Sequence, residues 1–160
     1  MSFISNFERY KMPNLGLVRL PEVKVEDAVR KRLNLCEYAT NFDTLRALAE
    51  EGFARKSKDL PKKQLQKYRE QLNFELSIVN ELSFVDYFLL VWMVINKARE
   101  LGAFIDYGRG SCAASLIFYL LDITGVDPIA KNLIFERFIS RVRAKKQIVD
   151  GITFLWGELA

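Results

Sequence analysis

The stretch Gly108-Arg109-Gly110-Ser111 is the part of the sequence best suited to hold a ligand. Its glycines let the backbone approach a ligand closely, and small residues continue to Ser115 before an apolar run that predicts a helix. Free N–H groups at the start of that helix would face an anion, with Ser111 adding a hydroxyl and Arg109 charge-assisted hydrogen bonds. The same residues also fit a tight turn with a serine cap, because short glycine loops are weak motifs.

A second charged group begins at Phe135-Glu136-Arg137-Phe138 and continues with basic side chains, namely Arg141, Arg143, Lys145 and Lys146. One interpretation is a cationic strip that faces the phosphates of a nucleotide or of DNA. The alternative is an ordinary solvated basic turn in which Glu136 neutralises a neighbour. A further basic cluster from Arg55 to Arg69 is interpreted as a solubilising face.

The residue types that are missing exclude several kinds of chemistry. The sequence holds no histidine, so Ser-His-Asp and Cys-His mechanisms are not available within it. Cys36 and Cys112 lie too far apart for the common zinc-site spacings. Structural zinc is therefore excluded, and any chemistry must rest on carboxylates, Lys, Arg, Ser or another metal.

The 160 residues are half apolar, which predicts one domain with a sizeable core. Lys and Arg number 24 against 20 Asp and Glu, so the net charge of +4 favours phosphate-bearing partners without requiring them. The apolar run Tyr87–Ile95 is short for a membrane span, which takes about 20 residues. Because the N-terminal segment also lacks the apolar stretch of an export signal, we expect a soluble, cytoplasmic protein with no membrane partner.

Helices dominate the expected secondary structure. The first 40 residues hold a loop-like stretch followed by a helix candidate over Val25–Leu35. A short amphipathic helix is predicted from Asn41, as its N-cap, to about Gly52. A longer helix follows Pro61, which suits a first helical turn, and its apolar face comprises Leu65, Tyr68, Leu72, Leu76 and Val79.

The second half of the chain predicts a small sheet. An almost wholly apolar segment predicts a buried helix over 84–101 that ends at Gly102, and β-forming residues predict a strand over 103–107. Near the end, Asp150-Gly151 between two β-rich runs predicts a hairpin. The expected fold class is α+β and predominantly helical, with the strand and the C-terminal hairpin packed against the buried helix.

Several segments, taken in order, resemble the palm of C-family DNA polymerases, the bacterial polymerase III alpha subunits and their phage relatives. The similarity extends over residues 41–143 and rests on Tyr68–Leu76, Phe84–Trp92, Gly108–Ser111 with Ala114–Leu116, Ile123–Pro128 and Leu133–Phe138. It implies an N-terminal loop and helix segment over 1–40 and, over 41–160, a partial palm of the polymerase-beta-like nucleotidyltransferase type.

The resemblance implies a role for the glycine loop. In that family the Gly-Ser element contacts the triphosphate of the incoming dNTP, which implies the same role for Gly110 and Ser111. Arg109, Arg137 and Arg143 match arginines of the same phosphate-binding surface.

The resemblance also implies where the chemistry lies. An Asp-x-Asp pair in the family holds two Mg²⁺ ions shortly after the Phe-Glu-Arg-Phe segment. No two acidic residues of this chain are separated by one residue, so we expect it to end just before those aspartates and to bind no Mg²⁺ tightly. Two departures accompany this: Asp106-Tyr107 replaces the usual Gly-Pro, and residues 147–156 resemble a hairpin of some phage members.

Three hypotheses follow. The first is a fragment of a DNA-directed DNA polymerase, inactive alone, whose partners are dNTP, primer-template DNA and the remainder of the polymerase, with Mg²⁺ in the full enzyme. Its uncovered palm surface would favour self-association. The second is a non-catalytic, polymerase-derived module that binds nucleic acid or a replication protein. The third is an unrelated helical adaptor whose Gly-Arg-Gly-Ser loop is only a cap.

Overall fold

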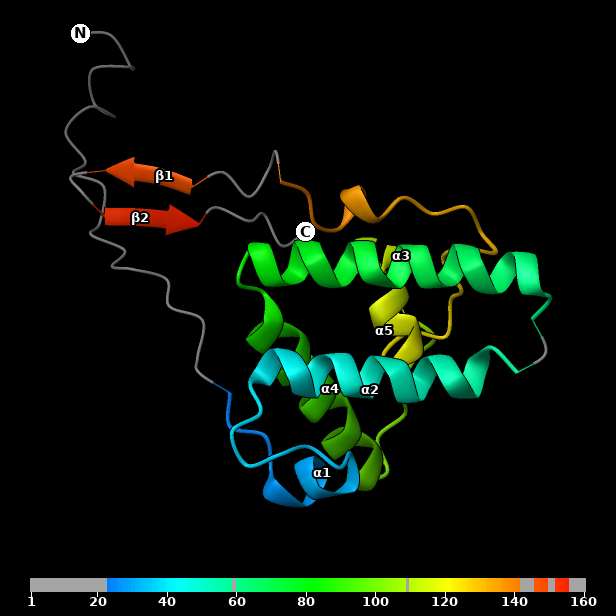
Figure 1. Ribbon diagram of the computed structural model, residues 1–160, viewed down its shortest axis with the longest axis horizontal. Helices are drawn as coiled ribbons and strands as arrows, with labels where there is room; N and C mark the ends of the chain where they lie inside the picture. The colour runs from blue at the N-terminus through cyan, green and yellow to red at the C-terminus, as the bar shows by residue number, and fades with distance from the viewer. Residues whose placement is uncertain (1–22, 59, 109, 142–145, 150–151, 156–160) are drawn as a thin grey trace, which may run out of the picture.

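The computed structural model describes residues 23–58, 60–108, 110–141, 146–149 and 152–155 (Figure 1). Its elements, in chain order, are α1 (Asp27–Arg32), α2 (Asn41–Lys56), α3 (Lys62–Glu81), α4 (Val85–Glu100), the 3-10 turn η2 (Ser111–Ala114), α5 (Leu116–Leu120), the 3-10 turn η3 (Phe135–Arg137), β1 (Lys146–Val149) and β2 (Ile152–Leu155).

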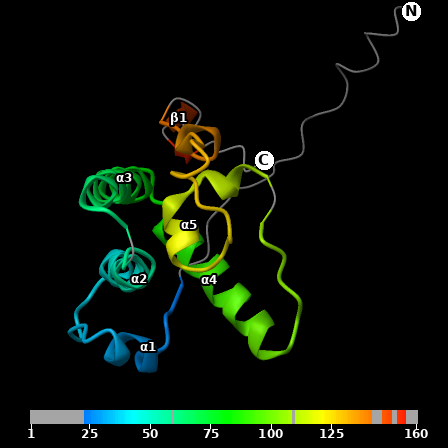
Figure 2. The same cartoon turned by 90° about the vertical axis from the view of Figure 1, so that its right-hand side faces the viewer.

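Helices α2 and α3 run antiparallel, and the short helix α5 packs against both (Figure 1). Figure 2 views α2 and α3 nearly end-on and shows α5 beside them, with α4 crossing next to it. Helix α4 also packs on α2, while its C-terminal end extends away from the α2–α3 pair. Helix α5 therefore occupies the middle of the helical body although it is one of its shortest helices.

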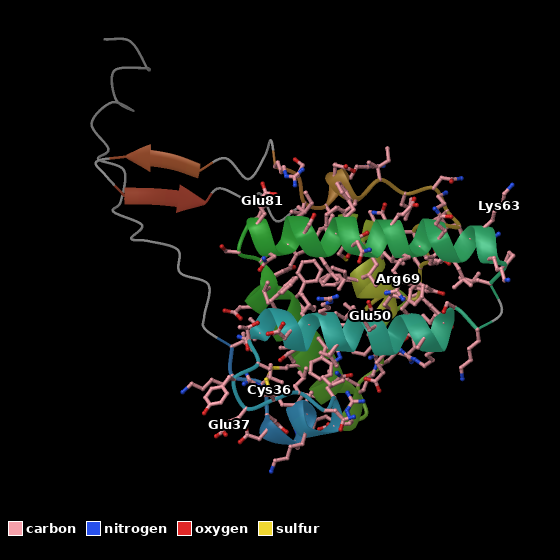
Figure 3. The ribbon with its side chains drawn as sticks, viewed as in Figure 1. Cys36, Glu37, Glu50, Lys63, Arg69 and Glu81 are labelled. Atoms are coloured by element: carbon pink, nitrogen blue, oxygen red, sulfur yellow. The ribbon has the colours of Figure 1, made fainter. Side chains whose placement is uncertain are left out.

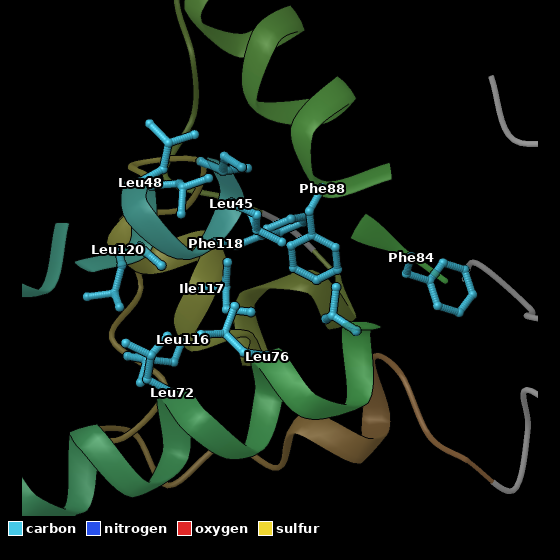
Figure 4. Packing of buried hydrophobic residues seen from close by; sticks show 14 of the residues in the cluster. Leu45, Leu48, Leu72, Leu76, Phe84, Phe88, Leu116, Ile117, Phe118 and Leu120 are labelled. Atoms are coloured by element: carbon cyan, nitrogen blue, oxygen red, sulfur yellow. The ribbon is translucent and has the colours of Figure 1, made fainter. Parts of the chain in front are cut away.

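The hydrophobic core surrounds α5. Leu116 and Ile117 are fully buried, and the rings of Phe88 from α4 and Phe118 from α5 lie 4.6 Å apart between centroids. Figure 4 shows leucines of α2 and α3 converging on this helix from two sides. Apolar residues recur at three and four positions along α2 and α3, so each helix turns one continuous stripe toward α5.

Helix α2 begins with a capping box rather than at the predicted N-cap. Thr40 accepts a hydrogen bond from the N–H of Asp43, and the Asp43 carboxylate accepts one from the N–H of Thr40. Asn41 is the first helical residue, and its side-chain amide donates to the carbonyl of Val23 and to the Asp86 carboxylate of α4. The predicted cap is wrong by one residue because Asn41 binds neighbouring segments instead.

Four helices end in the same way, with a left-handed residue after the C-cap. These residues are Asn34 (φ 54°), Ser83 (φ 60°), Gly102 (φ 76°) and Asp122 (φ 58°). In each case the next N–H bonds to the carbonyl five residues earlier, as in Ala103 to Ala98 and Ile123 to Phe118. The predicted end of the apolar helix at Gly102 is confirmed.

The predicted α+β class is wrong. Within residues 23–58, 60–108 and 110–141 the structure contains helices, turns and irregular segments but no strand. Residues 103–107 are irregular and largely exposed, because none of the strands that the structure describes pairs with their backbone. β1 and β2 pair antiparallel as a two-stranded ladder, which is not the predicted sheet on helix 84–101. The Asp150-Gly151 turn lies outside the described residues.

The helix predicted over 84–101 exists as α4, but its burial is lower than predicted. Only Phe88 and Leu89 are fully buried along it, because its second half leaves the body. No single helix in the described part of the chain is long and apolar enough to cross a membrane. α3 and α4 pass that test only as a pair, and they are bent by 110° at the break between them.

Gly52 lies inside α2 and not at its predicted end, and it marks the closest approach of α2 to α5. A Cβ at Gly52 would lie 2.1 Å from the carbonyl oxygen of Leu120. We expect Gly52→Ala to lower the free energy of unfolding by about 2 kcal/mol, because the overlap outweighs the helix-propensity gain of about 1 kcal/mol. Urea unfolding measures this difference.

Ala54→Ser is the matched control, since it adds one heavy atom at an exposed position of the same helix. Its effect should stay within about 0.5 kcal/mol. Equal stability of Gly52→Ala and the wild type would contradict the close packing of α2 on α5.

Candidate functional site

The structure brings together two of the predicted phosphate-binding segments. η2 begins directly after Gly110, whose φ is 75°, and it lies beside η3, the turn that carries Arg137. Ser111 therefore sits at the start of one 3-10 turn and Arg137 at the end of its neighbour. Arg109 and Arg143 lie outside the described residues. The phosphate-binding role of all five predicted residues stays a prediction.

The helix predicted to follow the glycine loop does not start there. The 3-10 turn η2 intervenes, and Ser115 then caps α5 by accepting a hydrogen bond from the N–H of Phe118 at 3.3 Å. Ser115 is fully buried, whereas Gly110 is exposed. The first turn of α5 is therefore set back from the loop surface.

The N–H groups at the start of α5 are occupied by Glu75 of α3. Its carboxylate accepts hydrogen bonds from the N–H of Leu116 at 2.9 Å, the N–H of Ile117 at 3.1 Å and the hydroxyl of Ser115 at 2.9 Å. Gln71 donates a further bond at 2.9 Å. The Glu75 carboxyl already occupies the N–H groups of Leu116 and Ile117, so the predicted use of these groups for an external phosphate is wrong.

Glu75 is a buried ionisable group, with none of its surface exposed. Burial raises the pKa of the Glu75 carboxyl to about 7, although the four hydrogen bonds donated to it act in the opposite direction. The structure therefore places a carboxyl that changes charge near neutral pH between α3 and α5.

Sequence reasoning missed Glu75, although a signal was present. Glu75 lies three residues after Leu72 and four before Val79, which puts it on the apolar stripe of α3. An acidic residue on a stripe that faces the core must find donors there, because an unpaired buried charge is costly. The sequence alone does not show that those donors belong to α5.

The C-terminal end of α5 is held by basic residues of α2. Arg55 donates to the carbonyl of Leu120 at 3.2 Å, Lys56 donates to the carbonyl of Tyr119, and both pair with Asp122. These positive charges lie at the end of the helix where they are favourable. Arg55 and Lys56 thus have a structural role at the end of α5 that their interpretation as part of a solubilising face did not include.

Arg69 joins α3 to α2. Its guanidinium pairs with Glu50 and lies over the ring of Phe53, 4.1 Å from the centroid. Figure 3 shows Arg69 and Glu50 facing each other between the two helices, while Lys63 points outward from the start of α3. Basic residues of this cluster thus divide between helix-to-helix contacts and the solvated surface.

The segment around η3 is anchored by aromatic residues. Phe135 and Phe138 are buried, and the ring of Phe135 packs edge-on against Phe74 of α3. Arg137, between them in sequence, is exposed. Arg141 forms a two-point pair with Glu81 at the end of α3, with bonds of 2.6–3.0 Å. Arg141 is thus engaged by a carboxylate, whereas Arg137 stands on the exposed side of η3.

The carboxylates that the structure describes do not gather into a metal site. Among the described residues, no group of three or more Asp, Glu, His or Cys side chains lies close enough together to hold a metal ion. Asp106, the acidic residue nearest to the loop in sequence, accepts a hydrogen bond from the N–H of Tyr107 at 2.7 Å.

Residues 43–150 match the family model described as the bacterial DNA polymerase III alpha NTPase domain. Similar curated proteins include the DNA polymerase III subunits alpha of Streptococcus pyogenes serotype M18, 43% identical over 83 residues, and of Bacillus subtilis strain 168, 42% identical over 85 residues. That of Ureaplasma parvum serovar 3 is 47% identical over 83 residues. These matches cover 52–53% of this chain and 8–9% of each relative. The resemblance to C-family DNA polymerases is thereby confirmed.

The raised pKa of Glu75 makes stability depend on pH. The folded chain holds the Glu75 proton more tightly than the unfolded chain. Protonated Glu75 therefore contributes to the free energy of unfolding in full below pH 4.5, and this contribution is lost as pH rises toward about 7. We expect a fall on the order of 3 kcal/mol in the free energy of unfolding across this window. No histidine titrates there. Glu75→Gln should remove the slope, measured by urea unfolding at a series of pH values.

Glu70→Gln is the control, because Glu70 is an exposed residue of the same helix that also accepts a glutamine amide. It should keep the wild-type slope. An unchanged slope in Glu75→Gln would show that the pKa of Glu75 is the same in the folded and unfolded chain, and would contradict this prediction.

Proposed function

Because the chain belongs to the family of the bacterial DNA polymerase III alpha NTPase domain, we propose that it holds the triphosphate of an incoming nucleotide in a replicative, C-family DNA polymerase. The observation that carries this proposal is the placement of the Gly110-Ser111 turn beside η3 and Arg137. Two segments separated in sequence, each with donors suited to phosphate, lie next to each other at the surface.

Each proposed residue has a distinct part. Gly110 adopts a left-handed conformation and has open space where a Cβ would point, so a phosphate group has room to approach the backbone. Ser111 would donate its hydroxyl, and Arg137 would supply a charge-assisted bond from the opposite side. Arg109 and Arg143 would extend the same surface. The donors are then those of η2 and of the arginines and not those of α5.

Catalysis would require residues that this sequence does not contain. It has no Asp-x-Asp pair, and its described carboxylates do not gather into a metal site. Mg²⁺ would be held by aspartates elsewhere in the polymerase, and the chain alone would be inactive. Primer-template DNA and the remainder of the polymerase would be its partners, in the cytoplasm. Since the chain spans less than a tenth of its curated relatives, these activities concern the whole enzyme.

A second role, as a contact surface, is favoured by exposed apolar residues after α4. Leu101, Phe104 and Tyr107 are 77%, 91% and 75% exposed. Solvent-exposed aromatic residues gathered in one short segment are typical of protein interfaces. In the isolated chain this segment would favour self-association, and in the polymerase it would contact another part of the enzyme or a replication protein.

We expect the isolated chain to associate with increasing concentration, and Phe104→Ser to weaken this association about tenfold because a large apolar side chain is removed. Sedimentation velocity over a concentration series measures it. Tyr38→Ser is the control, since Tyr38 is equally exposed but precedes α2. A chain that stays monomeric throughout would contradict the proposed contact surface.

The nucleotide site is tested by titrating Mg²⁺-dNTP into the chain at low salt and following backbone amide shifts. Shifts should centre on residues 108–115 and η3, and Ser111→Ala or Arg137→Ala should weaken binding about tenfold, since each removes a hydrogen bond to a charged group. Arg46→Ala, on α2, and Ser57→Ala, at the C-cap of α2, are the controls. Absent or scattered shifts would contradict a nucleotide site.

Primer extension tests the proposed inactivity of the chain alone. With primer-template DNA, dNTP and Mg²⁺ we expect no template-dependent product. Detectable extension would overturn the assignment of catalysis to residues outside this sequence.

A further inference from the structure

The segment Leu101–Tyr107, here called the strap, rejoins the helical body just before the Gly110-Ser111 turn. It is mostly exposed, and residues 105–107 line a small hollow together with residues 122–125 after α5. At Tyr107 the backbone carbonyl accepts two hydrogen bonds, from the N–H of Gly125 at 2.8 Å and from the hydroxyl of Thr124 at 2.9 Å. This doubly bonded carbonyl is the point at which the strap is tied to the body.

The two segments also interlock sterically at this point. Gly108 has φ 109°, and a Cβ there would lie 2.7 Å from the hydroxyl oxygen of Thr124. A Cβ on Gly125 would lie 2.1 Å from the ring of Tyr107. Glycine at both positions lets Tyr107–Gly108 lie directly against Thr124–Gly125. The fit leaves little freedom for the backbone at Tyr107–Gly108.

Thr124 is itself firmly held. It is 2% exposed, its hydroxyl oxygen accepts a bond from the N–H of Val126 at 3.1 Å, and its own N–H bonds to the carbonyl of Phe118 in α5. Because Thr124 is bonded to α5, its hydrogen bond to Tyr107 fixes the end of the strap relative to that helix. The downstream end of the same loop is tied to α5 through Ser115 and Glu75.

We propose that Thr124 is a positioning residue for the Gly110-Ser111 turn. By holding the Tyr107 carbonyl and the Gly108 backbone, its hydroxyl determines where the chain enters η2 and hence the direction of the donors at Ser111. The consequence for nucleotide binding rests on the proposed function, whereas the control of loop geometry does not. Thr124 would contact no ligand and would act only through the loop.

The test compares Thr124→Val, which keeps the shape but removes the hydroxyl, with Thr124→Ser, which keeps the hydroxyl. Thr44→Val is the matched control, because Thr44 of α2 is also fully buried and its hydroxyl donates one bond, to the carbonyl of the N-cap residue Thr40. In the ligand-free protein, Thr124→Val should shift the amide signals of Gly108, Gly110 and Ser111 and speed their hydrogen exchange. Thr124→Ser should restore both, and Thr44→Val should change neither.

Binding of Mg²⁺-dNTP is the second measurement. Thr124→Val should weaken it about fivefold, as expected for a displaced donor, with Thr124→Ser close to the wild type. Unchanged loop signals in Thr124→Val, or equal loop changes in Thr44→Val, would overturn the positioning role. A shifted loop together with no nucleotide binding by the wild type would support the positioning role and overturn the proposed function.

Discussion

The buried carboxylate of Glu75 at the start of α5 is the interaction on which the rest of the structure depends. A helix as short as Leu116–Leu120 is not stable alone, because nucleation is costly and few internal hydrogen bonds follow. Here its first N–H groups bind Glu75 and its last carbonyls bind Arg55 and Lys56. Side chains of α3 and α2 thus complete the hydrogen bonding of α5 and fix it between them. The apolar packing of the core then has one helix on which to converge.

The position of the candidate site is fixed relative to α5. The segment from Tyr107 to Ser115 is tied to the helix twice, through Thr124 upstream and through Glu75 downstream. Between these ties the chain makes an exposed turn with a left-handed glycine, which packing alone would not hold in place. Preorganisation of this kind favours binding, since a loop already ordered loses less conformational entropy when a ligand arrives.

Much of the helical framework could be predicted from the sequence, and the exceptions have physical causes. The apolar spacing of α2 and α3 and the glycine after α4 are local signals for helix formation and helix ending, and the fold follows them. Residues 103–107 have β-forming side chains, but a strand exists only with a partner, and none lies beside them among the described residues. The candidate turn could be located from its glycines, whereas its tie to Glu75 could not, because that contact joins residues 40 positions apart.

Counting basic residues overstates the charge that is available to a phosphate. Arg55, Lys56 and Arg141 are each paired with a carboxylate that fixes a helix end or a loop. The positive charges in these pairs are neutralised locally, although the net charge of +4 would suggest that they are available at the surface. Among the described residues, Arg137 is an exposed basic side chain on the turn beside Gly110-Ser111. Recognition of a phosphate by the proposed site would depend on the direction of each hydrogen bond more than on a broad field, so its affinity would vary with salt less steeply than that of a basic DNA-binding surface.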